Sequence, residues 1–369
     1  MGQSQEKIGI KEYLAIMILM VGTKLTDDTP AILFDNLRNA GWMGPLINGF
    51  IALILTYLLM RVVLSYENKN LIEVITHLFG KYLGYVVLFI LWIISFGALT
   101  VDTAIYTDII GTMYFTNTPT IVSYGVLMMV CAYGAKRGLE QIGSVAWAVF
   151  PYLQFILFVI LVLTLTQGEY AFLTPILGPG GWEVVKESSF RLSIYFDILY
   201  LFLLVPFVKS KKDFKKGTWI AFIVIVVQLT ITMIGYLVLF DYVSVEQLNY
   251  PFHELIRFIQ IGIFGRVESF FFPFWLIASF VRFAAYLYLS AMLFGWLFKI
   301  EEFEYVIPTF ATLIVLVGLI PESPTFAIFQ LREAILKFST PVFFMLPILL
   351  WMMAKLKGDL KHADNTNKK

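Results

Sequence analysis

The chain has 369 residues and a formal net charge of +1, with 59% hydrophobic and only 14% charged residues. Its mean hydropathy is +0.80, whereas a water-soluble domain carries about 25% charged residues and does not expose so much apolar surface. These values exclude a water-soluble protein and, without a basic arm or zinc-ligand spacing, a nucleic-acid-binding protein. They predict an all-α integral membrane protein.

Apolar segments of membrane-spanning length follow one another along the chain. In the first half we predict spans at residues 12–37, 43–64, 83–114, 119–135 and 144–166, of which the first is interrupted. In the second half we predict spans at residues 188–208, 218–240, 267–298, 305–320 and 338–355. We therefore expect about ten transmembrane helices in a single transmembrane domain over residues 1–369, ending in a tail at 356–369.

Lysine and arginine concentrate on one side of this ten-span arrangement. With the amino terminus inside, 18 of the 27 Lys and Arg residues fall on the inner side and seven in outer loops, while Lys24 and Arg282 fall within spans. Because cytoplasmic loops carry the excess of Lys and Arg, we expect both termini in the cytoplasm.

The chain lacks residue patterns typical of an enzyme, a metal site or a cofactor site. Cys131 is the single cysteine and lies inside the fourth segment, so we interpret it as a packing residue. His77, His253 and His362 are scattered, and no two have the spacing of metal ligands. No phosphate-binding loop, nucleophile elbow or dinucleotide fingerprint is present. We expect no metal, no cofactor and no enzymatic activity.

The first apolar segment contains a polar interruption. It is Gly22-Thr23-Lys24-Leu25-Thr26-Asp27-Asp28-Thr29-Pro30. A glycine, three charges and a proline cannot continue a lipid-facing helix, so we interpret the stretch as unwound backbone that lines a cavity. The alternative is a short first span with this stretch at its outer end.

Charged side chains also lie inside the third, sixth and eighth segments. Asp102 and Asp108 are six residues apart, so only one is expected to face the interior. Asp197 lies midway along the sixth segment, and Arg282 lies midway along the eighth with Tyr286 one turn further on. Each such charge costs about 2.5–3.5 kcal/mol at the bilayer centre. Two interpretations stay open: structural ion pairs among these charges, or a ligand with an anionic and a cationic end, such as an amino acid.

Short motifs along most of the chain carry a resemblance to a known family. They are Gly41-Trp42, Gly80-Lys81-Tyr82-Leu83-Gly84, Gly138-Leu139-Glu140 with Val145-Ala146, Pro175-Ile176-Leu177-Gly178, Pro206 before a lysine-rich run, Arg266-Val267-Glu268-Ser269 with Trp275, and Pro321-Glu322. Each motif alone is weak, but together and in order they are specific. With them the chain resembles the B-subunit family of spore germinant receptors, the spore germination permeases of the amino acid–polyamine–organocation transporter superfamily.

The resemblance implies a fold, a pocket and partners. The fold is LeuT-like, with two five-helix inverted repeats at about 8–166 and 188–355 and with broken first and sixth helices. The pocket lies near the midplane between spans one, three, six and eight, where the intramembrane charges also fall. The implied protein senses a nutrient germinant in the spore inner membrane, together with an A subunit and a lipid-anchored C subunit.

Two departures from the family pattern affect the pocket. The family has a Gly-x-Gly-like break in the first span, whereas Lys24 here stands at the second glycine and either supplies a charge itself or fills a cation site. The sixth segment has no glycine between Trp182 and Gly217, so a break there falls at 193–197 without one.

We interpret the chain as a germinant-sensing subunit for an amino-acid-like ligand; the alternatives are an ion-coupled secondary amino acid transporter and a membrane scaffold. Arg282 is the expected carboxylate clamp, Asp197 or Asp102 the amine partner, and Tyr286 a residue that closes the pocket. We interpret Glu140 and Glu268 as structural, pairing with Arg137 and Arg266 or with backbone groups, with a gate role as the alternative for Glu268. The predicted ligand-binding residues are Gly22, Thr23, Lys24, Ala98, Asp102, Asp197, Arg282 and Tyr286.

Overall fold

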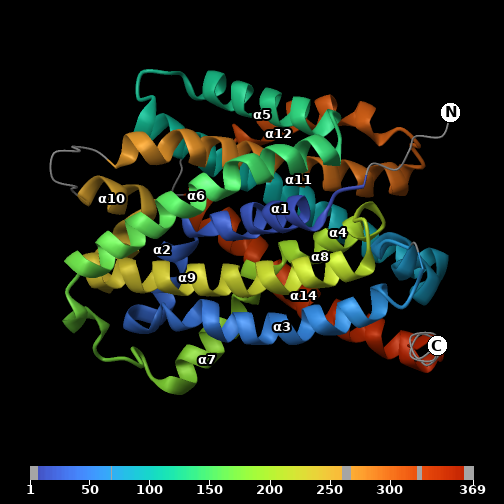
Figure 1. Ribbon diagram of the computed structural model, residues 1–369, viewed down its shortest axis with the longest axis horizontal. Coiled ribbons are helices and arrows are strands. Elements are labelled where there is room, and N and C mark those ends of the chain that lie inside the picture. Colours follow the sequence, from blue (N-terminus) through green and yellow to red (C-terminus); the bar gives the residue numbers. More distant parts are fainter. Residues whose placement is uncertain (1–6, 68, 260–266, 322–325, 361–369) are drawn as a thin grey trace.

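The computed structural model describes residues 7–67, 69–259, 267–321 and 326–360, and every element within these ranges is helical. The helices run roughly along the long axis of the molecule, and the start of α1 and the end of α14 lie at the same end of the bundle (Figure 1). An isolated bridge between Ile8 and Val208 joins the start of the described chain to the end of the sixth predicted segment.

The elements follow the predicted segments in order. The first half contains α1 (Ile10–Gly22), α2 (Thr29–Leu37), α3 (Met43–Val63), α4 (Leu71–Ile109) with a π-helical end (Ile110–Tyr114), α5 (Thr120–Lys136) and α6 (Leu139–Gln167). The second half contains α7 (Gly181–Phe190), α8 (Asp197–Leu201), α9 (Lys211–Gln247), α10 (Pro251–Phe258), α11 (Glu268–Phe298), α12 (Ile307–Gly318) and α14 (Glu333–Leu356).

Several of these helices are long and apolar enough to cross a membrane. Six meet this condition within the described residues, and α7 with Leu192–Phe207 forms a seventh span that is bent by 48°. α5 and α12 are shorter apolar helices, and α1 and α2 are the two halves of the interrupted first segment. Each of the ten predicted segments is therefore helical, and the chain is an all-helical, multi-pass membrane protein. Its orientation and its division into repeats stay predictions.

The first and sixth predicted segments are both broken. α1 ends at Gly22, a 3-10 turn follows at Thr23–Leu25, and α2 begins at Thr29 with a proline in its first turn, where the missing N–H costs nothing. α7 ends at Phe190, and two 3-10 stretches flank the short α8. The second break contains no glycine, as predicted. Both breaks leave backbone carbonyls available to side chains.

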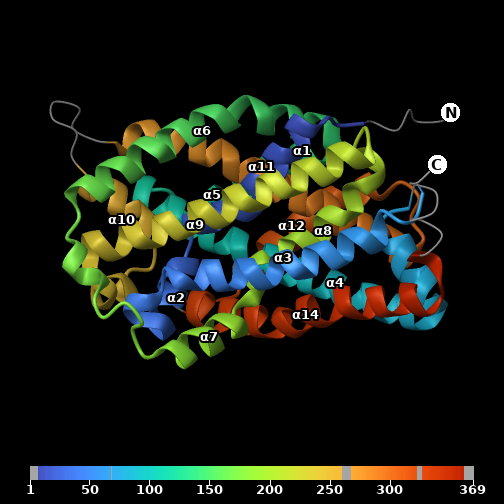
Figure 2. The same cartoon turned by 60° about the horizontal axis from the view of Figure 1, so that its bottom comes forward.

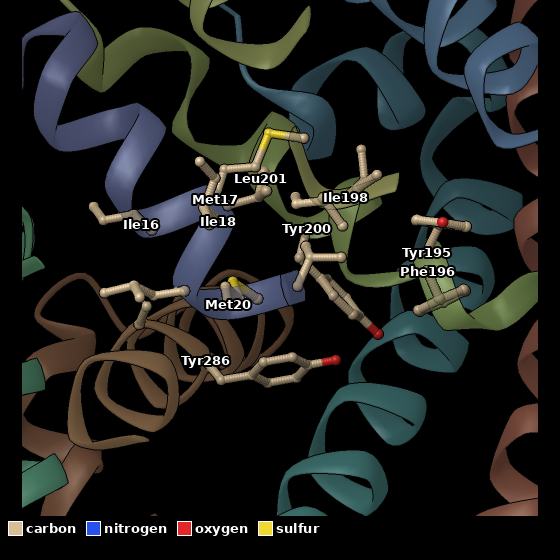
Figure 3. Close-up of a cluster of buried hydrophobic side chains, with 14 of the residues drawn as sticks. Ile16, Met17, Ile18, Met20, Tyr195, Phe196, Ile198, Tyr200, Leu201 and Tyr286 are labelled. Atoms are coloured by element: carbon tan, nitrogen blue, oxygen red, sulfur yellow. The ribbon is translucent and has the colours of Figure 1, made fainter. Parts of the chain in front are cut away.

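The two broken segments pack against each other at the centre of the bundle. α1 contacts α6, α9 and α11 and is buried over residues 15–22 (Figure 2). Apolar side chains of α1, among them Met17 and Met20, lie against those of the α8 region, and Tyr286 lies beside them (Figure 3). Because lipid offers the same apolar contacts, close packing and hydrogen bonds rather than water exclusion hold such helices together.

Several segments begin earlier than predicted, among them the third and the last. α4 begins at Leu71 rather than residue 83, with Asn70 and Glu73 forming a capping box and Gly80 (φ +79°) bending the helix. α14 begins at Glu333 rather than residue 338, after a π-helical turn at Ala327–Arg332. The second difference matters for function, because Arg332, counted above among outer-loop residues, lies inside the protein with 4% of its surface exposed.

Candidate functional site

Seven charged side chains are buried at the two breaks, each with 4% or less of its surface exposed. The broken first segment supplies three of them, and α4, α8, α11 and the π-helical turn before α14 supply one each. Buried charges are tolerated when they are paired. We call this set the charge network; it consists of Lys24, Asp27, Asp28, Asp102, Asp197, Arg282 and Arg332.

Arg282 on α11 joins three parts of the chain. Its Nη2 donates to Asp102 Oδ2 on α4 at 2.6 Å. Its Nη1 donates to the Tyr106 hydroxyl at 2.8 Å and to Thr23 Oγ1 at the first break at 3.1 Å. The guanidinium carbon also lies 5.3 Å from the centre of the Tyr106 ring. The guanidinium therefore makes one charge-assisted hydrogen bond to a carboxylate, through Nη2, and uses Nη1 for two hydroxyl groups.

Arg332 is a second guanidinium on the other side of Asp102. Its Nη2 donates to Asp27 Oδ2 at 3.1 Å and to Thr29 Oγ1 at 3.3 Å. Its Nη1 is paired with Asp102 Oδ1, so the two oxygens of Asp102 are divided between Arg282 and Arg332. The start of α14 is thereby joined to the first break and to α4.

Lys24 and Asp197 form a separate pair between the two breaks. Lys24 Nζ lies 2.7 Å from Asp197 Oδ2 and donates to the carbonyl oxygen of Ile194, also at 2.7 Å. The Tyr286 hydroxyl donates to Asp197 Oδ1 at 2.8 Å. The Lys24 ammonium therefore binds a carboxylate and a backbone carbonyl that the break at the sixth segment makes available.

The charges of the network do not balance. The described residues contribute four carboxylates and three cations to it. Both oxygens of Asp28 lack a hydrogen-bond partner among the described residues, and the Arg332 Nε lies 3.8 Å from Oδ1. Because an uncompensated buried carboxylate is costly, the network is suited to take up one further positive charge, a proton or a cation.

The structure brings most of the predicted ligand-binding residues together. Gly22 ends α1 directly before the network, whereas Ala98 lies one turn before Asp102 on α4 and is only half-buried. The residues that take part in the contacts of the network are Thr23, Lys24, Asp102, Asp197, Arg282 and Tyr286.

Asp108, the other aspartate of the third segment, lies elsewhere. It is half-buried and accepts a hydrogen bond from the Tyr250 hydroxyl at 2.6 Å. The expectation that only one of Asp102 and Asp108 faces the interior is therefore confirmed.

Sequence reasoning missed Arg332. The neighbouring Glu333 and Lys337 gave this stretch the composition of an outer loop. One signal was present: the polar interruption and the third and sixth segments together contain five aspartates, whereas the charge count placed only Lys24 and Arg282 within spans as cations. That imbalance indicates a missing cation near the membrane centre.

The predicted pair of Arg137 with Glu140 is not formed. The predicted pair of Arg266 with Glu268 cannot be described, because Arg266 lies outside the described residues. Glu268 pairs with Arg257, whose Nε lies 3.3 Å from Glu268 Oε1. Arg137 donates to the Tyr133 hydroxyl at 2.9 Å rather than to Glu140. The observed partners are therefore Tyr133, one turn earlier on α5, for Arg137, and Arg257 on α10 for Glu268.

Aromatic rings cover the network on the side away from the chain termini. Trp275 Nε1 donates to Thr26 Oγ1 at 3.0 Å, and its ring stacks on Tyr106 at 5.3 Å. His253 on α10, outside the spans, packs its ring 4.7 Å from Trp275, and burial lowers the pKa of His253 to about 3. Its imidazole is neutral at physiological pH and adds no charge here. Beyond these rings is an open cavity of about 670 Å³, between the π-helical end of α4, α10 and α11.

The space directly at the first break is small. One cavity, of about 30 Å³, borders Gly22, Thr23 and Trp275, and another, of about 10 Å³, borders Lys24 and Pro30. Ligand pockets usually measure about 300–1,000 Å³. The chain's own side chains therefore fill the centre of this arrangement.

Comparison with solved structures defines the class of protein. The chain superposes on the LeuT-fold transporter MhsT, solved in complex with L-phenylalanine, with a TM-score of 0.73 over 99% of this chain and 93% of MhsT. The identity is 16%, so the likeness concerns the fold. The predicted LeuT-like fold is confirmed: the chain is a membrane protein with the architecture of a secondary transporter.

Comparison with protein families then identifies the chain more closely. Residues 10–327 match the spore permease family, described as spore germination proteins, so the chain belongs to that family, whose members are not enzymes. It is 24% identical to spore germination protein YndE of Bacillus subtilis (strain 168), over 85% of this chain and 87% of YndE. It is 26% identical to spore germination protein KB of the same organism, over 79% of each chain.

Proposed function

We propose that this spore germination protein is a germinant-sensing subunit that binds a small amino-acid-like ligand at the charge network. One observation supports this most directly: Arg282 and Asp197 stand beside different helix breaks and offer a separate anion site and cation site. A guanidinium suits a ligand carboxylate, and a carboxylate with a backbone carbonyl suits an ammonium group.

The ligand would exchange with the chain's own side chains. Asp102 holds the place of the ligand carboxylate at Arg282, and Lys24 holds the place of the ligand ammonium at Asp197 and Ile194. A ligand that replaces these contacts binds better to a conformer in which the two breaks have moved apart. Binding then shifts the equilibrium between the two conformers. The size of the shift is set by the difference between the ligand's affinities for the two conformers.

Partner subunits would convert that shift into a signal. Membership of the germinant receptor B-subunit family supports a complex with a germinant receptor A subunit and a lipoprotein C subunit. On the same basis we propose the spore inner membrane as the location, with both termini on the spore core side.

An ion-coupled secondary amino acid transporter is the second candidate. The observation that favours it is the extra carboxylate, because Asp28 has no hydrogen-bond partner within the described part of the chain and could take up the coupling proton or cation. The likeness of the fold to a transporter is compatible with both functions.

Reconstituted protein separates the candidates. The full chain is placed in vesicles and given radiolabelled amino acids, with and without an H⁺ or Na⁺ gradient. Binding without uptake supports the sensing subunit, and uptake that follows a gradient supports the transporter. If neither occurs with a panel of amino acids, both proposals fail and the charges are structural pairs only. The variant Asp197→Asn serves as the site control.

A further inference from the structure

A groove on the surface of the bundle lies between α5, α6 and α11. Its volume is about 530 Å³, and its floor is made by Ile142, Val281 and Ala284, which are all buried. Half-exposed and exposed apolar side chains of the three helices form its walls. On α11 the lining extends from Ile277 to Ala284, about 10 Å along the helix at 1.5 Å per residue.

The groove is cationic at one end. Arg137 at the end of α5 and Gln141 on the first turn of α6 both line it. Arg137 Nη2 donates to the Tyr133 hydroxyl at 2.9 Å, and the guanidinium carbon lies 5.1 Å from the Tyr133 ring. Tyr133 also lines the groove, so the guanidinium is held over it. Among the described residues Arg137 has no carboxylate partner, which leaves its charge available.

The cationic end lies level with the beginning of α1. Lys11 at the beginning of α1 places its ammonium 5.5 Å from the ring of Trp147 on α6. A Cβ at Gly143 on α6 would lie 3.5 Å from the Ile8 side chain. Lys136, next to Arg137, sits 5.7 Å from the Tyr305 ring. Cations beside Trp and Tyr are typical of the interface between hydrocarbon and headgroups. By the charge count this interface is the cytoplasmic one.

We propose that this groove binds one anionic phospholipid, with its phosphate at Arg137 and an acyl chain on the apolar floor. The apolar walls suit a hydrocarbon chain, and the forked guanidinium suits a phosphate bidentately. The charge of Arg137 and Lys136 favours an anionic over a zwitterionic headgroup. The floor residues Val281 and Ala284 lie on the same helix as Arg282, so the lipid would pack against the helix that holds the charge network.

The test uses the full chain in nanodiscs that contain equal amounts of phosphatidylglycerol and phosphatidylcholine. Native mass spectrometry after release into detergent counts retained lipids. We expect one retained phosphatidylglycerol in the parent protein and about fivefold less in Arg137→Gln, since a cation near the headgroups contributes about 1 kcal/mol. Lys355→Gln is the matched control, because Lys355 also lies over an aromatic ring, Trp351 at 5.0 Å, but lines no part of the groove.

A second pair of variants tests the acyl-chain part. Val130→Trp fills the groove without altering Arg137, whereas Val126→Trp, one turn earlier on α5, lies outside it. We expect loss of the lipid in the first variant only. Equal retention of the two lipids, equal retention by the parent protein and Arg137→Gln, or no retained lipid would each overturn the proposal. If no lipid is retained, the groove would instead be a contact surface for a helix of another subunit. These results do not depend on germinant binding.

Discussion

Lys24 and Asp197 form a buried ion pair of 2.7 Å between the two broken helices, in which each residue comes from a different break. Both side chains are almost completely buried, so neither charge has water as a substitute partner. Loss of one partner leaves the other uncompensated, which makes this contact sensitive both to mutation and to a ligand that brings its own ammonium group.

The first prediction concerns this pair. Lys24→Met should lower stability by about 3–5 kcal/mol, because it leaves the Asp197 carboxylate buried and unpaired. Lys24→Met with Asp197→Leu should recover most of the loss, since both charges are then absent. Thermal unfolding of the purified protein in detergent measures both. A double variant that is no more stable than Lys24→Met would show that the pair is not coupled.

The second prediction concerns Arg332. Arg332→Gln should destabilise the chain by about 3–5 kcal/mol, because Asp27 and Asp102 lose a buried cation. Lys337→Gln is the control on the adjoining α14: its side chain is 65% exposed and pairs with Glu333, and such surface pairs contribute about 0.2–1 kcal/mol. Equal unfolding temperatures for the two variants would contradict a structural role for Arg332.

The third prediction compares two adjacent aspartates. Asp27 accepts hydrogen bonds from Arg332 and from the Thr29 backbone N–H, whereas Asp28 has no hydrogen-bond partner among the described residues. Asp27→Asn should therefore lower the unfolding temperature, while Asp28→Asn should leave it unchanged or raise it. If Asp28→Asn is the more damaging change, the charge count of the network is wrong.

The fourth prediction follows from the proposal that Lys24 holds the place of a ligand ammonium. Lys24→Ala should open a space beside Asp197, and a small primary amine such as propylamine should raise the unfolding temperature of this variant. The parent protein should not respond, and sodium chloride at equal ionic strength is the salt control. Absence of rescue in Lys24→Ala would mean that the site does not accept a free ammonium group.

The first break could be predicted from the residues because local chemistry determines it: Gly22, three charges and Pro30 cannot continue a lipid-facing helix. The break in the sixth segment was expected only from the resemblance to the family, because that segment has no glycine between Trp182 and Gly217. Burial of Asp102 and Arg282 followed from the cost of leaving a charge in lipid.

The pairing within the site could not be predicted in the same way. Which cation meets which carboxylate depends on how α4, α11 and the start of α14 come together, and single-sequence periodicity does not contain that information. Arg332 was missed because Glu333 and Lys337 follow it and resemble a loop. The π-helical turn that begins the last segment has no simple sequence signature.

The central claim is that Arg282 and Asp197 receive the two charged ends of a germinant. Its most direct test is dipicolinic acid release from spores that carry Arg282→Gln, Asp197→Asn or the control Lys355→Gln, over a panel of amino acids, nucleosides and sugars, with protein levels checked by blot. We predict that the response to an amino acid is lost in the first two variants, with the protein present, and is kept in the control. Unchanged dose responses in Arg282→Gln and Asp197→Asn would contradict the claim and reduce the network to structural ion pairs.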